Sequence, residues 1–214
     1  MPRIARSVLA GLPLHVVQRG INRQQCFFSD TDYAVYLKFL AEFSVRFGCS
    51  LHAYCLMTNH IHLLLTPERA DACALLMKNL GQRYVQSVNR KLERTGTLWE
   101  GRFKSGLVRS ESYVLACYRY IELNPVRAGM VSVPSQYRWS SYSTNAEGKG
   151  SELVRSHPAY DALGCDVAQR TSAYQQLCES APPVLILEEI RRATRIGCVI
   201  GKKRRVRGRP WEAK

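Results

Sequence analysis

Short apolar runs bounded by turn residues predict four β-strands in the first 110 residues. Three of these runs are compact, and the fourth alternates apolar and polar positions only weakly. Thr58-Asn59 forms a tight turn between the second and third runs, and Pro67 ends the third. The predicted strands are residues 14–19 (LHVVQR), 51–57 (LHAYCLM), 60–66 (HIHLLLT) and 101–108 (GRFKSGLV).

Three other segments repeat their apolar positions at helical spacing. One follows a sequence similar to a capping box and ends before Gly48, one runs from Ala72 to about Glu93, and one runs from about Ser110 to about Asn124. The order β-α-β-β-α-β, followed by a further helix, predicts an α+β fold of ferredoxin-like type, with a four-stranded antiparallel sheet and helices on one face. RNA-binding domains and unrelated enzymes share this topology, so it does not identify a function.

The pattern changes after Tyr142. The stretch STNAEGKGSE is small and polar, which is typical of a linker. Short helices are predicted beyond it, over residues 166–178 and 184–195, before the basic run GKKRRVRGRPWEAK. We therefore expect a main domain over residues 1–142, a linker over 143–153 and a helical, basic extension over 154–214.

Charge indicates the class of partner. The chain has 214 residues, with 31 Lys and Arg against 17 Asp and Glu, so its formal net charge is +14. This excess favours a polyanion, with nucleic acid as the first candidate. No apolar run approaches the roughly 18 residues that a membrane span needs, so no membrane partner is expected.

The eight cysteines are scattered and form no C-x-x-C pair, which argues against a zinc ribbon. The first residues lack the apolar core of an export signal. These features favour reduced cysteines and a cytoplasmic, nucleoid-associated protein.

The first candidate for chemistry is His60-Ile61-His62. Side chains of a strand alternate between its faces, so both imidazoles are expected to project together while Ile61 packs on the opposite face. Two convergent imidazoles suit a divalent metal ion. The alternative is a pair of ordinary strand histidines with local hydrogen bonds.

The second candidate is the helix around Tyr120. Tyr120 and Asn124 are four residues apart and share a helix face, whereas Tyr118 is expected in the core. Alternatively, Tyr120 is a half-buried helix tyrosine and Asn124 is only a helix-ending residue before Pro125. Together the two candidates suggest a tyrosine that attacks a phosphodiester while a nearby metal ion neutralises the developing charge.

At these residues the chain resembles the REP-associated tyrosine transposases. These belong to the HUH superfamily of single-strand DNA endonucleases and transposases. The resemblance covers roughly the first 142 residues. It rests on PRIAR, HVVQRGINRQ, LMTNHIHLLL, LWEGRFKS, YRYIELNPVRAGMV and RWSSY, in this order and spacing.

The resemblance implies a set of roles. His60, His62 and Asn124 would be ligands of Mg²⁺ or Mn²⁺, and Tyr120 would be the nucleophile. The expected activity is cleavage and rejoining of single-stranded DNA at hairpins formed by palindromic repeats, through a 5′-phosphotyrosine intermediate. No small-molecule substrate is expected, and both a monomer and a homodimer remain open.

Basic and aromatic residues are expected to hold the DNA. Trp99 is either a stacking platform for a base or a core residue. Arg127 either reaches the scissile phosphate or complements the end of a helix, and the terminal basic run either grips phosphates or is a solvated tail. The expected DNA-binding residues are Arg3, Arg6, Arg19, Arg23, Trp99, Arg102, Lys104, Arg127, Lys202, Lys203, Arg204 and Arg205.

Three other functions compete with this interpretation. One is a non-catalytic DNA-binding or regulatory protein on the same scaffold. Another is an RNA-binding module of RRM type, although the basic-aromatic pattern of that class is missing. The last is a metallohydrolase with a water nucleophile, which would form no covalent link to DNA.

Overall fold

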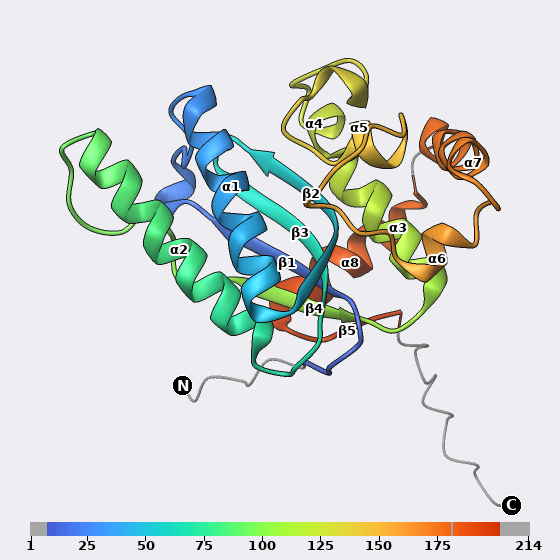
Figure 1. Cartoon of the computed structure of the whole chain (residues 1–214), viewed down its shortest axis with the longest axis horizontal. Coiled ribbons are helices and arrows are strands. Elements are labelled where there is room, and N and C mark those ends of the chain that lie inside the picture. Colours follow the sequence, from blue (N-terminus) through green and yellow to red (C-terminus); the bar gives the residue numbers. More distant parts are fainter. Residues whose placement is uncertain (1–7, 181, 202–214) are drawn as a thin grey trace, which may run out of the picture.

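A single five-stranded sheet, in the order β2-β3-β1-β4-β5, organises the chain (Figure 1). The computed structural model describes residues 8–180 and 182–201. Neighbouring strands are antiparallel, except that β4 and β5 run parallel. The strands are β1 (Leu14–Arg19), β2 (Cys49–Met57), β3 (His60–Pro67), β4 (Lys104–Val108) and β5 (Val199–Ile200).

The first four strands and the helices between them confirm the predicted ferredoxin-like order. Two features differ from the expectation. The sheet has a fifth strand, β5, which is too short to give a periodic pattern in the sequence. Helices also cover both faces of the sheet rather than one.

Helices α1 (Asp30–Phe47) and α2 (Ala72–Lys91) cover the first face. Gly48 ends α1 in the left-handed conformation, with φ of 63°, as expected of a helix-ending glycine. The core on this side buries alternate residues of the central strands, among them Leu14 and Val16 of β1 and Ile61 of β3. The next residues of these strands therefore point to the opposite face.

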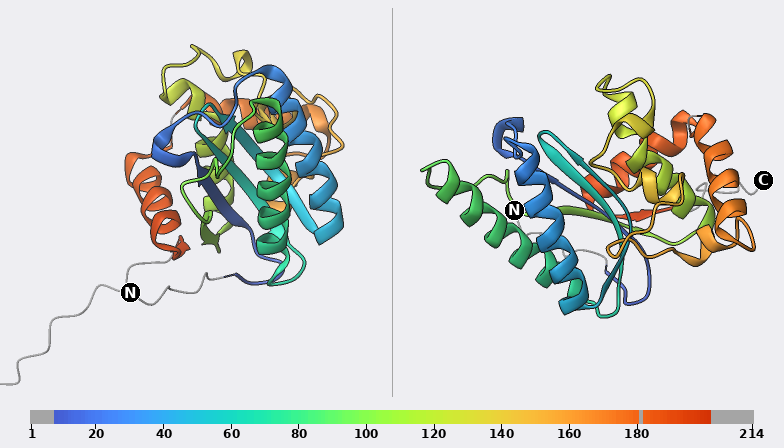
Figure 2. Two further views of the ribbon diagram at one scale, coloured as in Figure 1. Left: turned by 90° about the vertical axis from the view of Figure 1, so that its left-hand side faces the viewer. Right: turned by 45° about the horizontal axis from the view of Figure 1, so that its top comes forward.

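The second face is covered by helices α3 (Glu111–Glu122) and α8 (Val184–Ile196). Figure 2 shows α8 and the pair α1 and α2 on opposite sides of the sheet. The core on this side includes Leu64 of β3 and Tyr118 of α3, and Tyr118 is fully buried as expected. A short helix, α4 (Asn124–Arg127), follows α3 directly.

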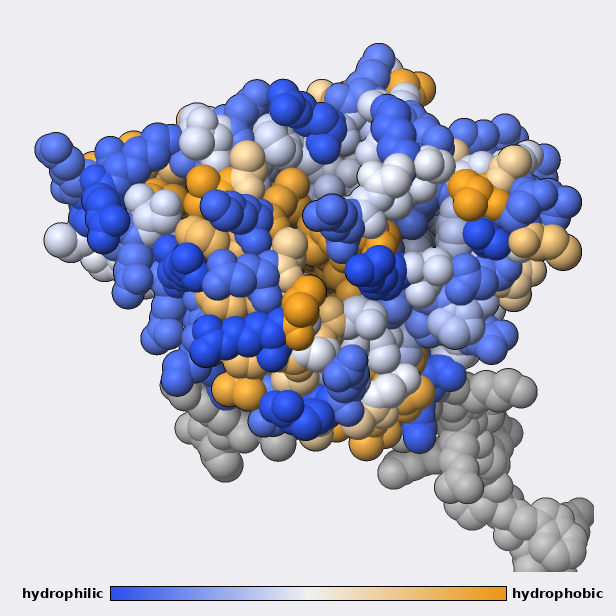
Figure 3. Space-filling model, in the orientation of Figure 1, coloured by the Kyte–Doolittle hydropathy of each residue, from blue (hydrophilic) through white to orange (hydrophobic). Residues whose placement is uncertain are grey.

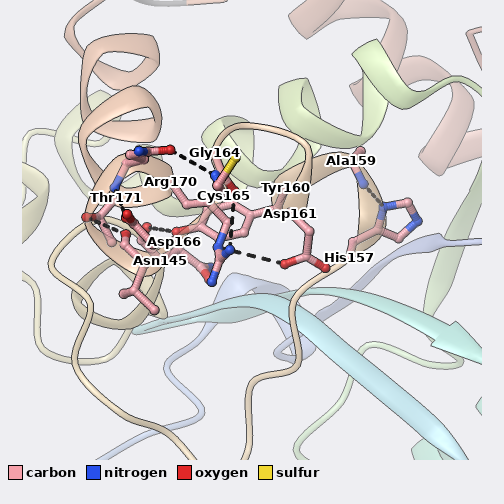
Figure 4. A network of polar contacts seen from close by, with 12 residues as sticks. Asn145, His157, Ala159, Tyr160, Asp161, Gly164, Cys165, Asp166, Arg170 and Thr171 are labelled. Carbon is pink, nitrogen blue, oxygen red and sulfur yellow. Dashed lines mark hydrogen bonds and ion pairs between the residues drawn. The ribbon is translucent and has the colours of Figure 1, made fainter.

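The stretch expected to be a polar linker is packed against the main domain. It begins in helix α5 (Tyr142–Asn145), and both Asn145 and Ala146 are buried. The extension continues through α6 (Pro158–Asp161) and α7 (Val167–Glu179). Figure 4 shows how polar contacts join these parts: the Tyr160 hydroxyl donates to the Asn145 carbonyl, and Arg170 reaches Asp161. Two 3₁₀ turns, η1 (Ile21–Arg23) and η2 (Pro134–Gln136), complete the described elements.

The surface is mainly hydrophilic on the face drawn in Figure 3. Hydrophobic residues reach that surface chiefly over α1 and the strands beside it. Within the described part of the chain, none of the helices is both long enough and apolar enough to cross a membrane.

Candidate active site

Strand β3 presents two histidines on the face covered by α3 and α8. His60 and His62 project together with ring centroids 4.9 Å apart, and Ile61 is buried in the core on the other face, as the alternation predicts. Strand β1 lies beside β3 and pairs Arg19 with His60 and Val17 with His62. The two imidazoles and the Arg19 side of β1 therefore share one surface of the sheet.

A third histidine, His15 of β1, contacts this pair. Its Nε2 lies 2.9 Å from Nδ1 of His62, and the two rings are stacked with centroids 5.2 Å apart. Its Nδ1 lies 2.8 Å from the hydroxyl of Thr194 on α8. The sequence interpretation did not include His15 or Thr194. In the sequence, His15 is marked only as a polar residue within an apolar strand. Its position beside His62 follows from the pairing of β1 with β3, which the local sequence does not show.

Asn59 fixes the proton position on His60. The Asn59 amide nitrogen donates to the carbonyl of Arg23 over 3.1 Å, which orients the amide. The amide oxygen then accepts a hydrogen bond of 2.6 Å from Nδ1 of His60. Because Nδ1 carries the proton, Nε2 of neutral His60 keeps its lone pair and is available to a metal ion.

Burial keeps all three histidines neutral. Burial, aided by Arg19, lowers the pKa of His60 to about 4. Burial and a smaller contribution from Arg127 lower the pKa of His15 to about 3. The pKa of His62 is also well below its usual value, chiefly through burial. Neutral imidazoles are the form that binds metals, so near neutral pH no proton has to be lost before binding.

Tyr120 on α3 lies over the histidines. Its side chain is 7% exposed, and its ring meets the rings of His15 and His62 edge-on at 5.4 Å and 5.6 Å. The guanidinium of Arg127 lies 4.5 Å from the centre of the same ring, and Arg127 also donates to the Tyr120 carbonyl. The predicted helix tyrosine and the predicted histidine pair are therefore neighbours in space.

Asn124 reaches the same place although Pro125 follows it. Helix α3 ends at Glu122, and α4 begins at Asn124 with Pro125 in its first turn, a position that proline tolerates. Asn124 lines the same cavity as His60 and Tyr120. The amide nitrogen of Asn124 is buried, and none of the described residues forms a hydrogen bond with it.

Two neutral imidazoles and an amide oxygen, all lining one cavity, are donor groups of a kind that divalent ions bind. Throughout residues 8–180 and 182–201, no group of three or more His, Cys, Asp or Glu side chains is placed to hold a metal.

The cavity in front of these residues is rich in positive charge. It has a volume of about 590 Å³ and lies between β1, β3, α3 and α8. One acidic residue, Glu100, lines it within the described chain. The basic side chains in its lining are Arg19, Arg102, Lys104, Arg191 and Arg195. The first three were predicted from the sequence, whereas Arg191 and Arg195 were missed because the extension was treated as a separate unit.

Trp99, which was either a stacking platform for a base or a core residue, lies in the core. Its side chain is 6% exposed and packs near the rings of Tyr36 and Tyr84, which corresponds to the packing alternative. It borders a second, mainly apolar cavity of about 920 Å³ beside α2.

The other predicted DNA contacts are distributed as follows. Arg127 lies against Tyr120, and Arg23 does not line the active-site cavity. Six predicted contacts lie outside the described residues: Arg3, Arg6, Lys202, Lys203, Arg204 and Arg205.

Similar proteins share both sequence and fold with this chain. A protein of Haemophilus influenzae with the provisional name REP-associated tyrosine transposase is 30% identical over 100 residues, which cover 42% of this chain and 57% of that protein. The chain thus matches little more than half the length of this relative.

Two solved structures are also similar. A REP-associated tyrosine transposase bound to a REP hairpin matches 73% of this chain and 93% of its own, with a TM-score of 0.60 and 17% identity, which supports the fold. A provisionally named transposase of Deinococcus radiodurans matches 53% of this chain and 91% of its own, with 22% identity and a TM-score of 0.38.

The profile of the family described as "Transposase IS200 like" matches residues 9–124. This match includes β1 through α3, and with them the three histidines, Tyr120 and Asn124. It spans more than half of the 214 residues. The chain belongs to the IS200-like transposase family.

Proposed function

We propose that this protein cleaves and rejoins single-stranded DNA through a covalent link to Tyr120. The observation that carries the proposal is the convergence of Tyr120, His60, His62 and Asn124 in one cationic cavity. These residues come from β3, α3 and α4. A structural role for each residue alone does not explain why all four line the same cavity. Family membership supports transposase chemistry.

The chemical step uses the phenol oxygen of Tyr120 as the nucleophile. That oxygen attacks a backbone phosphorus, a tyrosine–phosphorus bond forms, and the bond from phosphorus to the 3′-oxygen breaks. The phenol proton passes to water, and the departing 3′-oxygen takes a proton from water. One strand end is then a 5′-phosphotyrosine and the other a free 3′-hydroxyl. Attack of a 3′-hydroxyl on the phosphotyrosine reverses the step and rejoins the DNA.

His60, His62 and Asn124 would hold Mg²⁺ or Mn²⁺. The fit rests on the free Nε2 of His60, on the neutral state of both histidines and on the Asn124 amide nitrogen, which has no hydrogen-bond partner among the described residues. When bound, the ion neutralises negative charge on the phosphate. Arg127 and Arg191, whose guanidinium groups lie 4.5 Å and 5.9 Å from the Tyr120 ring centre, stabilise the same charge from the protein side.

We propose hairpin-forming single-stranded DNA as the substrate. Phosphates are attracted by the basic side chains around the cavity, which include Lys104 of β4 and Arg195 of α8. The structural relative described above is bound to a REP hairpin. The cavity is open to a strand from outside, because Arg191 and Arg195 at its rim are exposed.

A covalent-trapping experiment tests the nucleophile. The protein is incubated with Mn²⁺ and a hairpin oligonucleotide labelled at its 3′ end, and the products are separated on a denaturing gel. The wild type should transfer the label to the protein, whereas Tyr120→Phe should bind the oligonucleotide and transfer none.

Tyr113→Phe is the matched control. Tyr113 lies on the same helix, but its hydroxyl donates to Glu189 and it does not line the cavity. This variant should form the adduct as the wild type does. Adduct formation by Tyr120→Phe would show that another group is the nucleophile. Cleavage by both variants without any adduct would favour a hydrolase that uses water, and DNA binding without cleavage by the wild type would favour a non-catalytic binding protein.

A further inference from the structure

Three side chains from three parts of the chain form a buried line of hydrogen bonds. Thr194 on α8 contacts Nδ1 of His15 at 2.8 Å, and Nε2 of His15 contacts Nδ1 of His62 at 2.9 Å. All three residues are at most 4% exposed. Both nitrogens of His15 are therefore used within the protein, so His15 itself is not available to a ligand.

Two arrangements of protons are compatible with this line. In the first, Nδ1 of His62 donates to His15, and Nδ1 of His15 donates to the Thr194 oxygen. In the second, the Thr194 hydroxyl donates to His15, and Nε2 of His15 donates to Nδ1 of His62. Only the first leaves the lone pair on Nε2 of His62, while the second places a proton there.

On the neighbouring His60, Nε2 is also the nitrogen that carries no proton. The oriented amide of Asn59 already requires that His60 carry its proton on Nδ1. If His62 carries its proton on Nδ1 as well, the two histidines present matching Nε2 lone pairs to the cavity. A hydrogen bond at the second ring nitrogen is the usual device that fixes the tautomer of a metal-binding histidine.

Helix α8 is placed close enough to the sheet for this contact because β4 has a glycine at the crossing. Gly106 pairs with His15 in the sheet. A Cβ atom at Gly106 would lie 3.1 Å from the Thr194 hydroxyl and 2.9 Å from the end of Ile200. The absence of a side chain at Gly106 lets Thr194 approach His15.

We propose that Thr194 and His15 are positioning residues that hold His62 in the Nδ1-protonated tautomer and so prepare its Nε2 for the metal. The extension then completes the active site from a distance, through α8. The role in metal binding rests on the proposed function, whereas the tautomer of His62 can be tested without it.

The first test measures the tautomer in the metal-free protein. Ring nitrogens of ¹⁵N-labelled histidine are recorded by NMR, and the His62 signals are assigned with a His62→Gln variant. We expect wild-type His62 to carry its proton on Nδ1. In Thr194→Val the oxygen that accepts from His15 is gone, so a proton on Nδ1 of His15 would be buried without a partner. We therefore expect His15 to donate to His62 and the His62 proton to move to Nε2.

The second test measures the affinity for Mn²⁺ by electron paramagnetic resonance. Thr194→Val should weaken binding about tenfold or more, the range typical for loss of such a supporting contact. Thr194→Ser keeps the hydroxyl and should bind as the wild type does. Circular dichroism checks that all the variants are folded.

The outcomes separate the two proposals. If wild-type His62 carries its proton on Nε2, or Thr194→Val changes neither the tautomer nor the affinity, the positioning role is wrong, even if the Tyr120 adduct forms. If His62 has the expected tautomer and Thr194→Val shifts it, the positioning role stands, even if no adduct forms and the proposed nuclease function fails.

Discussion

The ring of Tyr120 lies close to two guanidinium groups and is nearly perpendicular to two imidazole rings. Arg127 follows it on α4, and Arg191 comes from α8 in the extension. The imidazoles of His15 and His62 limit the positions that the ring can take. In the proposed reaction, a tyrosine restrained in this way loses little conformational freedom when it attacks, which is one source of catalytic rate.

Arg191→Gln tests the contribution of the extension at this residue. The variant removes a positive charge near the phenol and the phosphate, and we expect single-turnover adduct formation to slow about tenfold to a hundredfold. The neighbouring Arg192 is also exposed but does not line the cavity. Arg192→Gln is therefore the matched control and should react as the wild type does. If the wild type, Arg191→Gln and Arg192→Gln form the adduct at equal rates, Arg191 does not contribute to the reaction.

At the scale of elements, a buried carboxyl joins the helix that carries Tyr120 to the extension. Glu122 of α3 is fully buried and accepts hydrogen bonds from Ser141, from Asn145 of α5 and from Tyr174 of α7. Burial raises the pKa of Glu122 to about 7, although the three donors act in the opposite direction. The proton is thus held more tightly in the folded state than in the unfolded state.

This shift gives a prediction for stability. A raised folded-state pKa means that the contribution of the neutral carboxyl is lost as the pH rises from about 4.5 to about 7. We expect the stability of Glu122→Gln, measured as its free energy of unfolding minus that of the wild type, to increase between pH 5 and pH 7.5.

Urea denaturation at the two pH values measures this difference. The buried histidines, whose pKa values are lowered, make the stability of the protein rise with pH in part of this range. Their effect is the same in the wild type and the variant, so it cancels when the two are compared at each pH. A difference that does not change with pH would show that Glu122 has the same pKa in both states.

Much of the arrangement of elements was predictable, because local patterns encode it. The alternation of side chains along the strand HIHLLLT predicted that both histidines lie on one face. The four-residue helical spacing predicted that Tyr120 and Asn124 lie on the same side, and both line the cavity. The polar composition of STNAEGKGSE concealed the packing of Asn145, because a hydrogen bond to the distant Glu122 satisfies its buried amide. The roles of His15 and Arg191 depend on strand order and on the return of α8 to the sheet, which no local pattern contains.

At the scale of the whole molecule, the net positive charge favours binding of a DNA strand, and several of the basic side chains surround the cavity. Salt should weaken binding of a single-stranded oligonucleotide, because each neutralised phosphate releases counterions and contributes about 0.7 to the slope of log affinity against log salt. Arg102 and Lys104 line the cavity. The double variant Arg102→Gln, Lys104→Gln should therefore reduce the slope by about 1.4.

Fluorescence anisotropy at several NaCl concentrations measures this slope. Arg83 on α2 forms an ion pair with Glu42 and lies outside the cavity, so Arg83→Gln is the control and should leave the slope unchanged. A double variant with the wild-type slope would place the bound strand elsewhere on the molecule.

Helix α8 also has a consequence for the order in which the site is made. A ribosome synthesises His15, His62 and Tyr120 well before it reaches Arg191 and Thr194. A nascent chain, or a product of premature termination ahead of α8, has the phenol and the histidines but lacks the support that α8 provides. If the protein cuts DNA as proposed above, it therefore acquires full competence only late in translation.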